Sequence, residues 1–345
     1  MRVVAGMSGG VDSSAAVELL REQGHEVIGC TLVMARGDGA PASPSEAALD
    51  RAAETCRKLG IPHLIRDVTG DFERWVTGPF FDEYLAGRTP SPCVACNRHV
   101  KVAALLDVAD QVGAEMVATG HYARKAIGMD GVARIARGTD AKKDQSYFLC
   151  QLTPEQVARM VLPLAPYEKP RVRQLAAVAS LPAAAVEDSQ GVCFAPKGDY
   201  RAFLRERSPE AFEPGDFVDE EGEVLGRHGG VAGFTVGQRK GIGLAGGPWF
   251  VKAIDAPSRT IVLTRGAPEP PRSFTVRCEH VELGPAVTVQ TRYRAPDLAA
   301  TYHQEGDLVV VTPQEPGCLA APGQTCAFYL GDTVVGGGTV VDLRY

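Results

Sequence analysis

A glycine- and serine-rich loop near the N-terminus constrains the fold of this chain more than any other part of its sequence. The loop reads Gly6-Met7-Ser8-Gly9-Gly10-Val11-Asp12-Ser13-Ser14, after a predicted strand at Arg2–Ala5 and at the start of a predicted helix at Ser14–Gln23. Glycines let backbone N–H groups close around an anion, and the helix N-terminus adds the positive end of its dipole. The sequence therefore predicts a phosphate site between a strand and the following helix.

The loop differs from the two most common phosphate-binding motifs. It lacks the lysine of Gly-x-x-x-x-Gly-Lys-Ser/Thr and the spacing of the dinucleotide-binding glycines. Its Ser-Gly-Gly-x-Asp-Ser run resembles the PP-loop ATPases, which implies that it holds the β,γ-pyrophosphate of ATP while the substrate attacks the α-phosphate. We expect ATP contacts from Gly6, Met7, Ser8, Gly9, Gly10, Val11, Asp12 and Ser13. The role of Asp12 is open between support of the loop and contact with Mg²⁺, and the structural alternative is a turn that only caps a helix.

The first half of the chain alternates short Val/Ile-rich runs with longer amphipathic stretches, which is typical of an α/β domain with a parallel sheet. The predicted strands are Arg2–Ala5, Glu26–Met34, His63–Asp67 and Glu115–Thr119. The predicted helices are Ser14–Gln23, Ser45–Leu59, Phe72–Ala86, Val100–Gln111, Thr153–Met160 and Arg171–Ala179. Gly24 and Gly60 stand where helix-ending glycines are expected. The Gly/Pro/Ser-rich segment Arg36–Ser45 is expected to be a mobile loop.

From about Asp216 the sequence changes to short strands separated by glycine-rich turns. This pattern predicts two small barrel-like β modules that meet near Gly266–Pro271. The length of 345 residues also favours two or three domains over one.

Charge and hydropathy exclude a membrane protein but leave a nucleic-acid partner open. No run of 18 uncharged apolar residues is present, and a strand begins at once at the N-terminus, so we expect a cytoplasmic protein. The net charge is −6, yet residues 121–210 hold 14 Lys and Arg against 10 Asp and Glu. A local basic face and an ordinary solvated surface both fit this distribution.

Nine cysteines in a cytosolic chain indicate thiols, catalytic groups or metal ligands before structural disulfides. Six have mostly apolar sequence neighbours and are expected to pack in the core: Cys30, Cys56, Cys150, Cys278, Cys318 and Cys326. Cys93 and Cys96 stand three residues apart after two prolines, and Cys193 lies in a turn-rich segment. A helix N-terminus with Arg88 and Arg98 nearby is expected to lower the pKa of the paired thiols.

A lone Cys-x-x-Cys fits a redox pair, half a zinc site or a pair of cluster ligands. Its position away from the first strand argues against a thioredoxin-like pair, and a zinc ribbon would need a second Cys-x-x-Cys. Three thiols, two adjacent and one remote, are left as the candidate site.

Seven motifs in the same order identify a family resemblance that spans nearly the whole chain. They are Gly6–Ser14, Arg88–Arg98, Ala118–Tyr122, Lys142–Leu149, Asp188–Phe194, Thr235–Gly241 and Thr291–Arg294. Together they resemble the bacterial tRNA-specific 2-thiouridylases. The resemblance implies a PP-loop domain of the adenine nucleotide α-hydrolase type in residues 1–198, a small central β domain in 199–267 and a C-terminal β-barrel in 268–345.

The resemblance also implies a reaction. ATP bound by the loop, with Met34 and Gly120 completing the nucleotide site, adenylates the C2 oxygen of a flipped-out wobble uridine in tRNA. Cys193 carries sulfur as a persulfide, and Cys96 attacks that persulfide to leave a disulfide between the two. A cysteine desulfurase or a sulfur-relay protein is the expected donor, no membrane partner is expected, and the expected substrates are the tRNAs for Glu, Gln and Lys.

The same resemblance assigns contacts to RNA. The target base is expected against Ser91, Pro92 and Cys93, near the anticodon loop's wobble position. The remaining tRNA contacts are expected from His121, Lys143, Asp144, Gln145, Arg292, Tyr293 and Gln324.

One position departs from the family pattern, because Cys93 stands where the well-known form has an aspartate. Cys93, Cys96 and Cys193 then form a set of three thiols that suits either the persulfide route, with Cys93 a third thiol, or a [4Fe-4S] cluster with one open iron. A PP-loop ligase or amidotransferase acting on a small molecule is the enzymatic alternative. An RNA-binding or metal-storage protein with a vestigial loop is the non-enzymatic one.

Overall fold

A computed structural model describes residues 1–35, 46–187, 191–195, 199–282, 284, 287–317 and 320–345. The expected mobile loop Arg36–Ser45 and Cys318 lie outside these ranges. The chain forms two compact units. The first unit contains Met1–Val76, Cys93–Phe194 and Tyr329–Val335, and the second contains Thr77–Pro92, Ala195–Phe328 and Gly336–Tyr345. Among the described residues, no helix has the length and apolar character needed to cross a bilayer.

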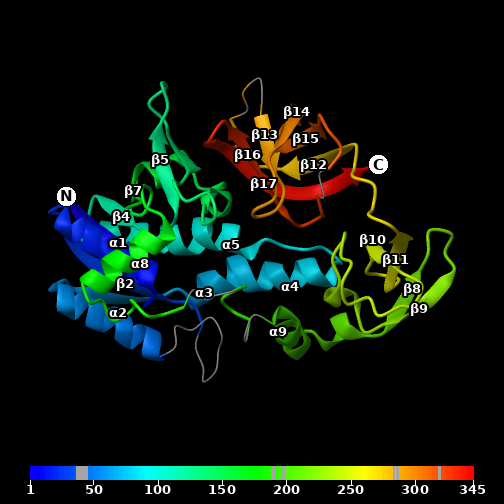
Figure 1. Cartoon of the computed structure of the whole chain (residues 1–345), viewed down its shortest axis with the longest axis horizontal. Coiled ribbons are helices and arrows are strands. Elements are labelled where there is room, and N and C mark those ends of the chain that lie inside the picture. Colours follow the sequence, from blue (N-terminus) through cyan, green and yellow to red (C-terminus); the bar gives the residue numbers. More distant parts are fainter. Residues whose placement is uncertain (36–45, 188–190, 196–198, 283, 285–286, 318–319) are drawn as a thin grey trace. The chain divides into compact units, whose positions relative to one another are not determined.

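A five-stranded parallel sheet in the order β3-β2-β1-β4-β7 forms the centre of the first unit (Figure 1). Its strands are β1 Arg2–Gly6, β2 Glu26–Val33, β3 His63–Asp67, β4 Met116–Ala118 and β7 Met160–Val161. β1 pairs with β2 on one side and with β4 on the other, which places a topological switch point at its carboxyl end. The predicted α/β fold is confirmed.

Helices cover this sheet and fix the phosphate loop at its edge. They include α1 Val11–Glu22, α2 Glu46–Leu59, α6 Ala103–Val112, α7 Pro154–Ala158 and α8 Lys169–Val178. Val17 and Leu20 of α1 and Ala52 of α2 pack in one core cluster with Val3 and Ala5 of β1. Because alternate residues of a strand point to opposite faces, these contacts define one covered face of the sheet.

Two helical stretches are longer and less regular than predicted. The predicted helix Phe72–Ala86 is α3 Thr69–Phe72, a π-helix at Glu73–Thr77 and α4 Gly78–Leu85. The predicted helix Val100–Gln111 begins earlier, as α5 Pro92–Ala95 and a π-helix at Cys96–Val102 that runs into α6. Proline is favourable at the first position of a helix, so Pro92 begins this one instead of only preceding it.

A small four-stranded sheet and a helix form part of the second unit. The strands are β8 Gly215–Val218, β9 Val224–His228, β10 Trp249–Asp255 and β11 Thr260–Arg265, in the order β10-β11-β8-β9. Phe217, Val251 and Leu263 lie in its core. The helix is α9 Tyr200–Arg207, and its Tyr200 stacks on Tyr84 of α4 with ring centroids 5.0 Å apart.

A closed barrel follows this sheet along the chain, in agreement with the sequence. Its described strands are β12 Ser273–Arg277, β13 Val287–Gln290, β14 Leu298–Glu305, β15 Leu308–Pro313, β16 Thr325–Leu330 and β17 Thr333–Arg344. Pairing of β12 with both β15 and β17 closes the barrel. A hairpin that the sequence did not predict, β5 Ala123–Ile127 and β6 Ala133–Arg137, joins β17 through Thr333 and Ala136.

Candidate active site

The structure around the phosphate loop requires glycine at two positions, Gly9 within the loop and Gly120 beside it. Gly9 has a φ of +72°, and a Cβ atom there would lie 2.2 Å from the carbonyl oxygen of Ala48. Gly120, two residues beyond the end of β4, is constrained by close packing, because its Cβ would lie 2.8 Å from the carbonyl carbon of Asp12. Both glycines let backbone segments meet at the N-terminus of α1.

Hydroxyl groups brace the loop from within. The Ser8 N–H donates to Ser13 Oγ at 3.2 Å, and the hydroxyls of Ser13 and Ser14 donate to the carbonyl oxygen of Gly10 at 3.1 and 2.9 Å. No side chain caps the N-terminus of α1 at Gly10. The first N–H groups of a helix have no partner within the helix, so this end is suited to bind an anion.

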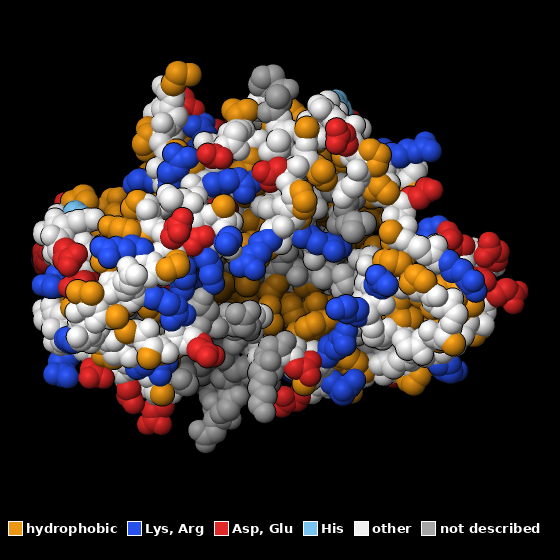
Figure 2. Space-filling model, viewed as in Figure 1, with side chains coloured by type: hydrophobic (Ala, Val, Ile, Leu, Met, Phe, Trp, Pro, Cys, Tyr) orange, Lys and Arg blue, Asp and Glu red, His pale blue; other side chains and the backbone are white. Residues whose placement is uncertain are grey.

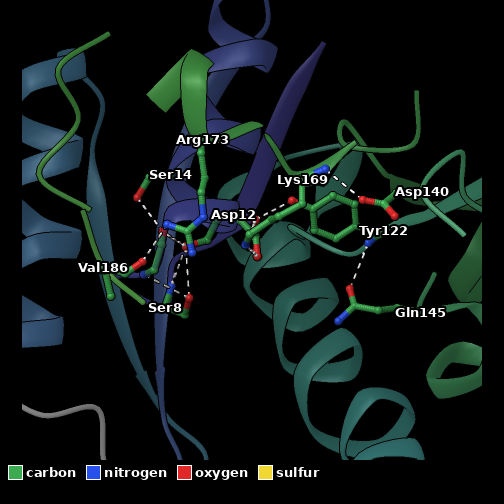
Figure 3. A network of polar contacts seen from close by, with 11 residues as sticks. Ser8, Asp12, Ser14, Tyr122, Asp140, Gln145, Lys169, Arg173 and Val186 are labelled. Atoms are coloured by element: carbon green, nitrogen blue, oxygen red, sulfur yellow. Dashed lines mark hydrogen bonds and ion pairs between the residues drawn. The ribbon is translucent and has the colours of Figure 1, made fainter. Parts of the chain in front are cut away.

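Asp12 is held by a lysine and a tyrosine (Figure 3). Lys169 Nζ lies 2.7 Å from both carboxylate oxygens of Asp12, and the Tyr122 hydroxyl donates to one of them at 2.7 Å. The lysine is buried, and its backbone N–H donates to Asp140 at 2.9 Å. Of the two roles left open for Asp12, this geometry fits support of the loop, because a cation already neutralises the carboxylate.

Lys169 and Arg173 are functional candidates that sequence reasoning missed. They stand four residues apart on α8 and therefore share one face of the helix. Arg173 donates to the carbonyl oxygen of Val186 at 3.1 Å and points toward Ser8 of the phosphate loop (Figure 3). The available signal was the position of Lys169 in the first turn of a helix, where the dipole disfavours a cation.

Met34 and Gly120 are placed as the sequence suggested, beyond the carboxyl ends of β2 and β4, which flank β1. Ligands of open α/β sheets bind at this edge. The side chain of Met34 is partly exposed.

The Lys143–Gln145 segment contains residues with different surroundings. Asp144 is buried, accepts from the Gly138 N–H at 2.8 Å and from the Ser146 hydroxyl at 2.6 Å. Gln145 pairs with the backbone of Tyr122, through its amide oxygen at 3.0 Å and its N–H at 2.8 Å. Asp144 and Gln145 thus shape the turn next to the Asp12 network, whereas Lys143 is partly exposed.

The three thiols of the candidate site differ in exposure. Cys96 is 4% exposed, Cys93 is partly exposed and Cys193 is exposed, and all three are free. The segment of Cys193 is anchored by Phe194, whose ring meets that of Phe72 edge-on with centroids 5.9 Å apart. The five described cysteines expected in the core are buried: Cys30, Cys56, Cys150, Cys278 and Cys326.

A lysine that the sequence analysis overlooked lies among these thiols. Cys96 begins the π-helix and Lys101 follows five residues later. In a π-helix the i→i+5 hydrogen bonds bring residue i+5 one turn above residue i, whereas in an α-helix it would lie about 140° around the axis. The charge of Lys101 opposes the effect of burial on the thiol pKa at both Cys96 and Cys93.

The predicted lowering of the thiol pKa is wrong. Burial raises the pKa of Cys96 to about 11 and also raises that of Cys93, and the positive charge of Lys101 offsets only part of this. Negative charge on Cys193 raises the pKa of both thiols further, so the three sulfurs lie within electrostatic reach of one another. Arg88 forms an ion pair with Glu83 at 2.6 Å. It does not lower the pKa of Cys93 or Cys96 as Lys101 does.

His121 lies in the same electrostatic environment. Burial and the charge of Lys101 lower the pKa of His121 to about 3. Its Nδ1 lies 2.8 Å from the Thr119 hydroxyl. The imidazole is therefore neutral near pH 7 and can accept or donate a hydrogen bond without adding charge.

The donor set of this site consists of three cysteine sulfurs. Three thiolates suit an iron–sulfur cluster chemically. Within the part of the chain that the structure describes, however, no group of three or more His, Cys, Asp or Glu side chains is placed to hold a metal ion. In this arrangement the described thiols do not form a preassembled metal site.

The expected base-contacting segment is fixed within the second unit by the loop that carries Gln324. The Ser91 hydroxyl accepts from the Thr325 N–H at 3.2 Å, and the Thr89 N–H donates to the carbonyl oxygen of Pro322 at 2.9 Å. A Cβ at Gly323 would lie 2.9 Å from the nitrogen of Thr89, so the two segments are in close contact. The amide oxygen of Gln324 is buried and has no hydrogen-bond partner among the described residues.

Arg292 and Tyr293 follow β13 of the barrel and are both partly exposed. Arg292 donates to the carbonyl oxygen of Val236 at 3.3 Å. The guanidinium of Arg294 lies over the Tyr293 ring, 5.0 Å from its centroid. The structure thus brings the expected RNA contacts of the second unit onto neighbouring segments.

Family models match the chain from end to end. Residues 1–197 match the tRNA methyl transferase HUP domain, residues 201–265 the tRNA methyl transferase PRC-barrel domain, and residues 273–340 the aminomethyltransferase beta-barrel domain. Among solved structures, the U34-tRNA thiolase NcsA from Methanococcus maripaludis with its [4Fe-4S] cluster is similar, with 20% identity and a TM-score of 0.36. That alignment covers 61% of this chain and 67% of the thiolase.

Relatives of known name match over almost their full length. The tRNA-specific 2-thiouridylase MnmA of Moorella thermoacetica is 43% identical, with 97% of this chain and 98% of the relative covered. The protein of the same name from Chloroflexus aurantiacus is 42% identical, with 98% of each chain covered. With the phosphate loop and the three thiols in place, these matches show that the chain belongs to the tRNA-specific 2-thiouridylase family.

Proposed function

We propose that this chain uses ATP to replace the C2 oxygen of the wobble uridine of tRNA with sulfur. One observation carries the proposal: a phosphate loop braced by Asp12 and Lys169 lies in the same compact unit as Cys93, Cys96 and Cys193. The expected substrates are the tRNAs for Glu, Gln and Lys. We place the ATP chemistry in residues 1–198, the linking β domain in 199–267 and barrel contacts to tRNA in 268–345.

Residues Gly6–Ser13 bind ATP through backbone N–H groups at the N-terminus of α1, with Met34 and Gly120 at the same sheet edge. Arg173 adds positive charge beside the phosphates, while Lys169 balances the charge of the Asp12 carboxylate. The C2 oxygen of uridine attacks the α-phosphorus, pyrophosphate leaves, and the oxygen becomes part of an AMP leaving group. Mg²⁺ is expected to arrive with ATP through phosphate oxygens. Because the Asp12 carboxylate is already paired with Lys169, we do not propose Asp12 or another side chain as a ligand of Mg²⁺.

Sulfur transfer then takes place at the thiols. A persulfide on Cys193, loaded by a cysteine desulfurase or a sulfur-relay protein, attacks C2 through its terminal sulfur, and AMP leaves. The thiolate of Cys96 attacks the Cys193 sulfur and breaks the S–S bond, so the terminal sulfur stays on C2. The product is a Cys96–Cys193 disulfide, which an external dithiol reduces by two electrons.

A second route would use Cys93, Cys96 and Cys193 as ligands of a [4Fe-4S] cluster. Anaerobic purification followed by iron and sulfide analysis distinguishes the two routes. About four irons and four sulfides per chain would replace the persulfide route, and Cys93→Ala with full activity would exclude the cluster. On the persulfide route Cys93 is a third thiol beside the target base.

The proposed tRNA contacts are those that the family resemblance implies. Lys143 and Arg292 suit phosphates, Tyr293 suits a sugar or base, and Ser91–Cys93 approach the target base. His121, Asp144, Gln145 and Gln324 complete the proposed set; Asp144 and Gln145 act by shaping the turn that presents Lys143.

Incubation with ATP, unmodified tRNA and cysteine together with a cysteine desulfurase, which supplies persulfide sulfur, tests the function. We expect pyrophosphate release that depends on tRNA, together with 2-thiouridine in digested tRNA. A ligase or amidotransferase acting on a small molecule would release pyrophosphate without tRNA. A binding protein with a vestigial loop would release none, and either result would overturn the proposal.

A further inference from the structure

The segment from the short helix at Val231–Gly233 into strand β10 carries positive charge and no acidic residue up to position 254. Residues 231–254 contain Arg239, Lys240 and Lys252 and no aspartate or glutamate, in a chain with a net charge of −6. Lys252 is paired with Glu220. Arg239 and Lys240 are exposed and form no ion pair with a carboxylate of the described residues.

The small domain also has an acidic turn. The acidic side chains of the turn between β8 and β9, at 219–223, gather at one edge of the domain in Figure 2. Glu220 of this turn pairs with Lys252, which leaves Arg239 and Lys240 as the exposed charges of the turn at 235–243. We call this turn the Gln238 loop, after the residue that holds it together.

The Gln238 loop is held rigidly by its own hydrogen bonds. The Gln238 side chain accepts from the Thr235 N–H at 3.1 Å and donates to the carbonyl oxygen of Lys240 at 2.9 Å. The backbone of Val251 in β10 pairs with the loop twice, with Gly237 at 2.8 Å and with Gln238 at 3.0 Å. Arg239 and Lys240 are therefore presented by a fixed backbone, which reduces the entropy lost when they bind a partner.

The surface of the loop leaves room for another chain to approach. Gly241 and Gly243 are exposed, and no described atom lies within 4 Å of the position a Cβ would take at Gly243. Arg239 lies over the Phe250 ring, 5.9 Å from its centroid, which steadies the guanidinium without using its hydrogen-bond donors.

Two segments with expected tRNA contacts touch the Gln238 loop within the same unit. Thr89, two residues before Ser91, donates through its hydroxyl to the Thr235 hydroxyl at 3.1 Å. On the barrel side, Arg292 donates to the carbonyl oxygen of Val236 at 3.3 Å. The loop thus connects the segment that approaches the target base with the barrel residue that suits a phosphate.

We propose that Arg239 and Lys240 of the Gln238 loop bind backbone phosphates of the same tRNA that is thiolated. This inference rests on the proposed function, because tRNA is the partner it assumes. Phosphate contacts fix the position of a protein on the nucleic acid and contribute to affinity, but they do not distinguish one base from another. The two residues therefore act in substrate binding, and Gln238 acts as a positioning residue that holds the loop.

Salt-dependent tRNA binding tests this proposal. In the double variant Arg239→Ala/Lys240→Ala we expect the slope of log K against log salt to become shallower by about two, and Kd at 0.15 M salt to rise about tenfold or more. The matched control is Arg227→Ala, which removes an exposed arginine from β9 of the same sheet. The control should leave slope and Kd within twofold of the parent.

Kinetics separate this inference from the proposed function. We expect the double variant to raise KM for tRNA about tenfold with kcat within twofold, because neither residue meets the reacting atoms. The conservative variant Arg239→Lys/Lys240→Arg should restore most of the affinity. Should the double variant unfold, Lys240→Gln alone is expected to reduce the slope by about one.

The outcomes are distinct. An unchanged slope and Kd in a folded variant, with a parent protein that thiolates tRNA, would overturn the inference and leave the function intact. A parent protein that does not bind or thiolate tRNA would overturn the proposed function first. A change in preference among tRNAs at constant salt slope would assign the loop to base contacts and so contradict phosphate binding.

Discussion

Lys169 Nζ lies 2.7 Å from each carboxylate oxygen of Asp12, and the two residues are separated by 157 positions in the chain. The pair ties the N-terminus of α8 to the N-terminus of α1, the end that forms the phosphate loop. The lysine is buried, and the Asp12 side chain is about a third exposed. The ion pair therefore compensates the charge of Lys169, which water does not reach.

Replacing Lys169 by methionine is expected to abolish ATP use and to destabilise the first unit. The substitution leaves the Asp12 carboxylate without its cation, at a cost of roughly 2–4 kcal/mol in the free energy of unfolding. Urea denaturation and tRNA-dependent pyrophosphate release measure the two effects. The double variant Asp12→Asn/Lys169→Met should regain stability but not activity; recovery of both would show that the pair serves folding alone.

A methyl group at Gly120 is expected to disrupt the phosphate loop. The added Cβ would lie 2.8 Å from Asp12 and 2.9 Å from the Ser13 nitrogen, and backbone atoms cannot yield as a flexible side chain can. We expect Gly120→Ala to weaken ATP binding at least tenfold in calorimetry. The control is Gly70→Ala in α3, where no described atom lies within 4 Å of the new Cβ, and it should bind ATP like the parent.

The reactivity of Cys96 should rise with pH far above neutrality. Its thiol pKa is about 11, so the thiolate fraction increases about tenfold per pH unit from pH 7 to pH 10. Lys101→Met should raise that pKa further and slow alkylation by iodoacetamide at every pH, with peptide mass spectrometry identifying the site. A rate that levels off near pH 8, or no effect of Lys101→Met, would contradict the assigned environment.

His121 is expected to remain neutral across the physiological range. Its folded-state pKa of about 3 lies below the ordinary value of 6.5, so the unfolded chain binds a proton in that window and the folded chain does not. Because of this residue, the free energy of unfolding decreases as pH falls from about 6.5 toward 3, by at most about 1.4 kcal/mol per pH unit. His121→Asn should lose less stability over this window; parallel pH curves of the two proteins would contradict the prediction.

The sequence was sufficient for the elements whose signal is local. β3 at His63–Asp67 has the predicted bounds, and Gly24 and Gly60 adopt the positive φ angles expected of helix-ending glycines. The phosphate loop could be identified because strand, glycines and helix are contiguous. The hairpin of β5 and β6 was missed, and its partner outside the hairpin, Thr333 of β17, lies about 200 residues further on in the sequence.

Most differences between the predicted and the observed candidate site depend on contacts between residues that are distant in the sequence. The thiol pKa was predicted from the sequence neighbours Arg88 and Arg98, but burial of Cys96 outweighs them and Lys101 is the nearby cation. Lys169 could not be linked to Asp12 without the fold that joins α8 to α1. The proposed role of the Gln238 loop could not be predicted from the sequence either, because it depends on contacts of the loop with Thr89 and Arg292, which are distant in the chain.

The most direct test of sulfur transfer is a single-turnover experiment with ³⁵S-labelled persulfide loaded on Cys193. After addition of ATP and unmodified tRNA, the account predicts that the label moves to 2-thiouridine and that one Cys96–Cys193 disulfide forms for each sulfur transferred. Label that stays on the protein, or 2-thiouridine that forms without this disulfide, would contradict it.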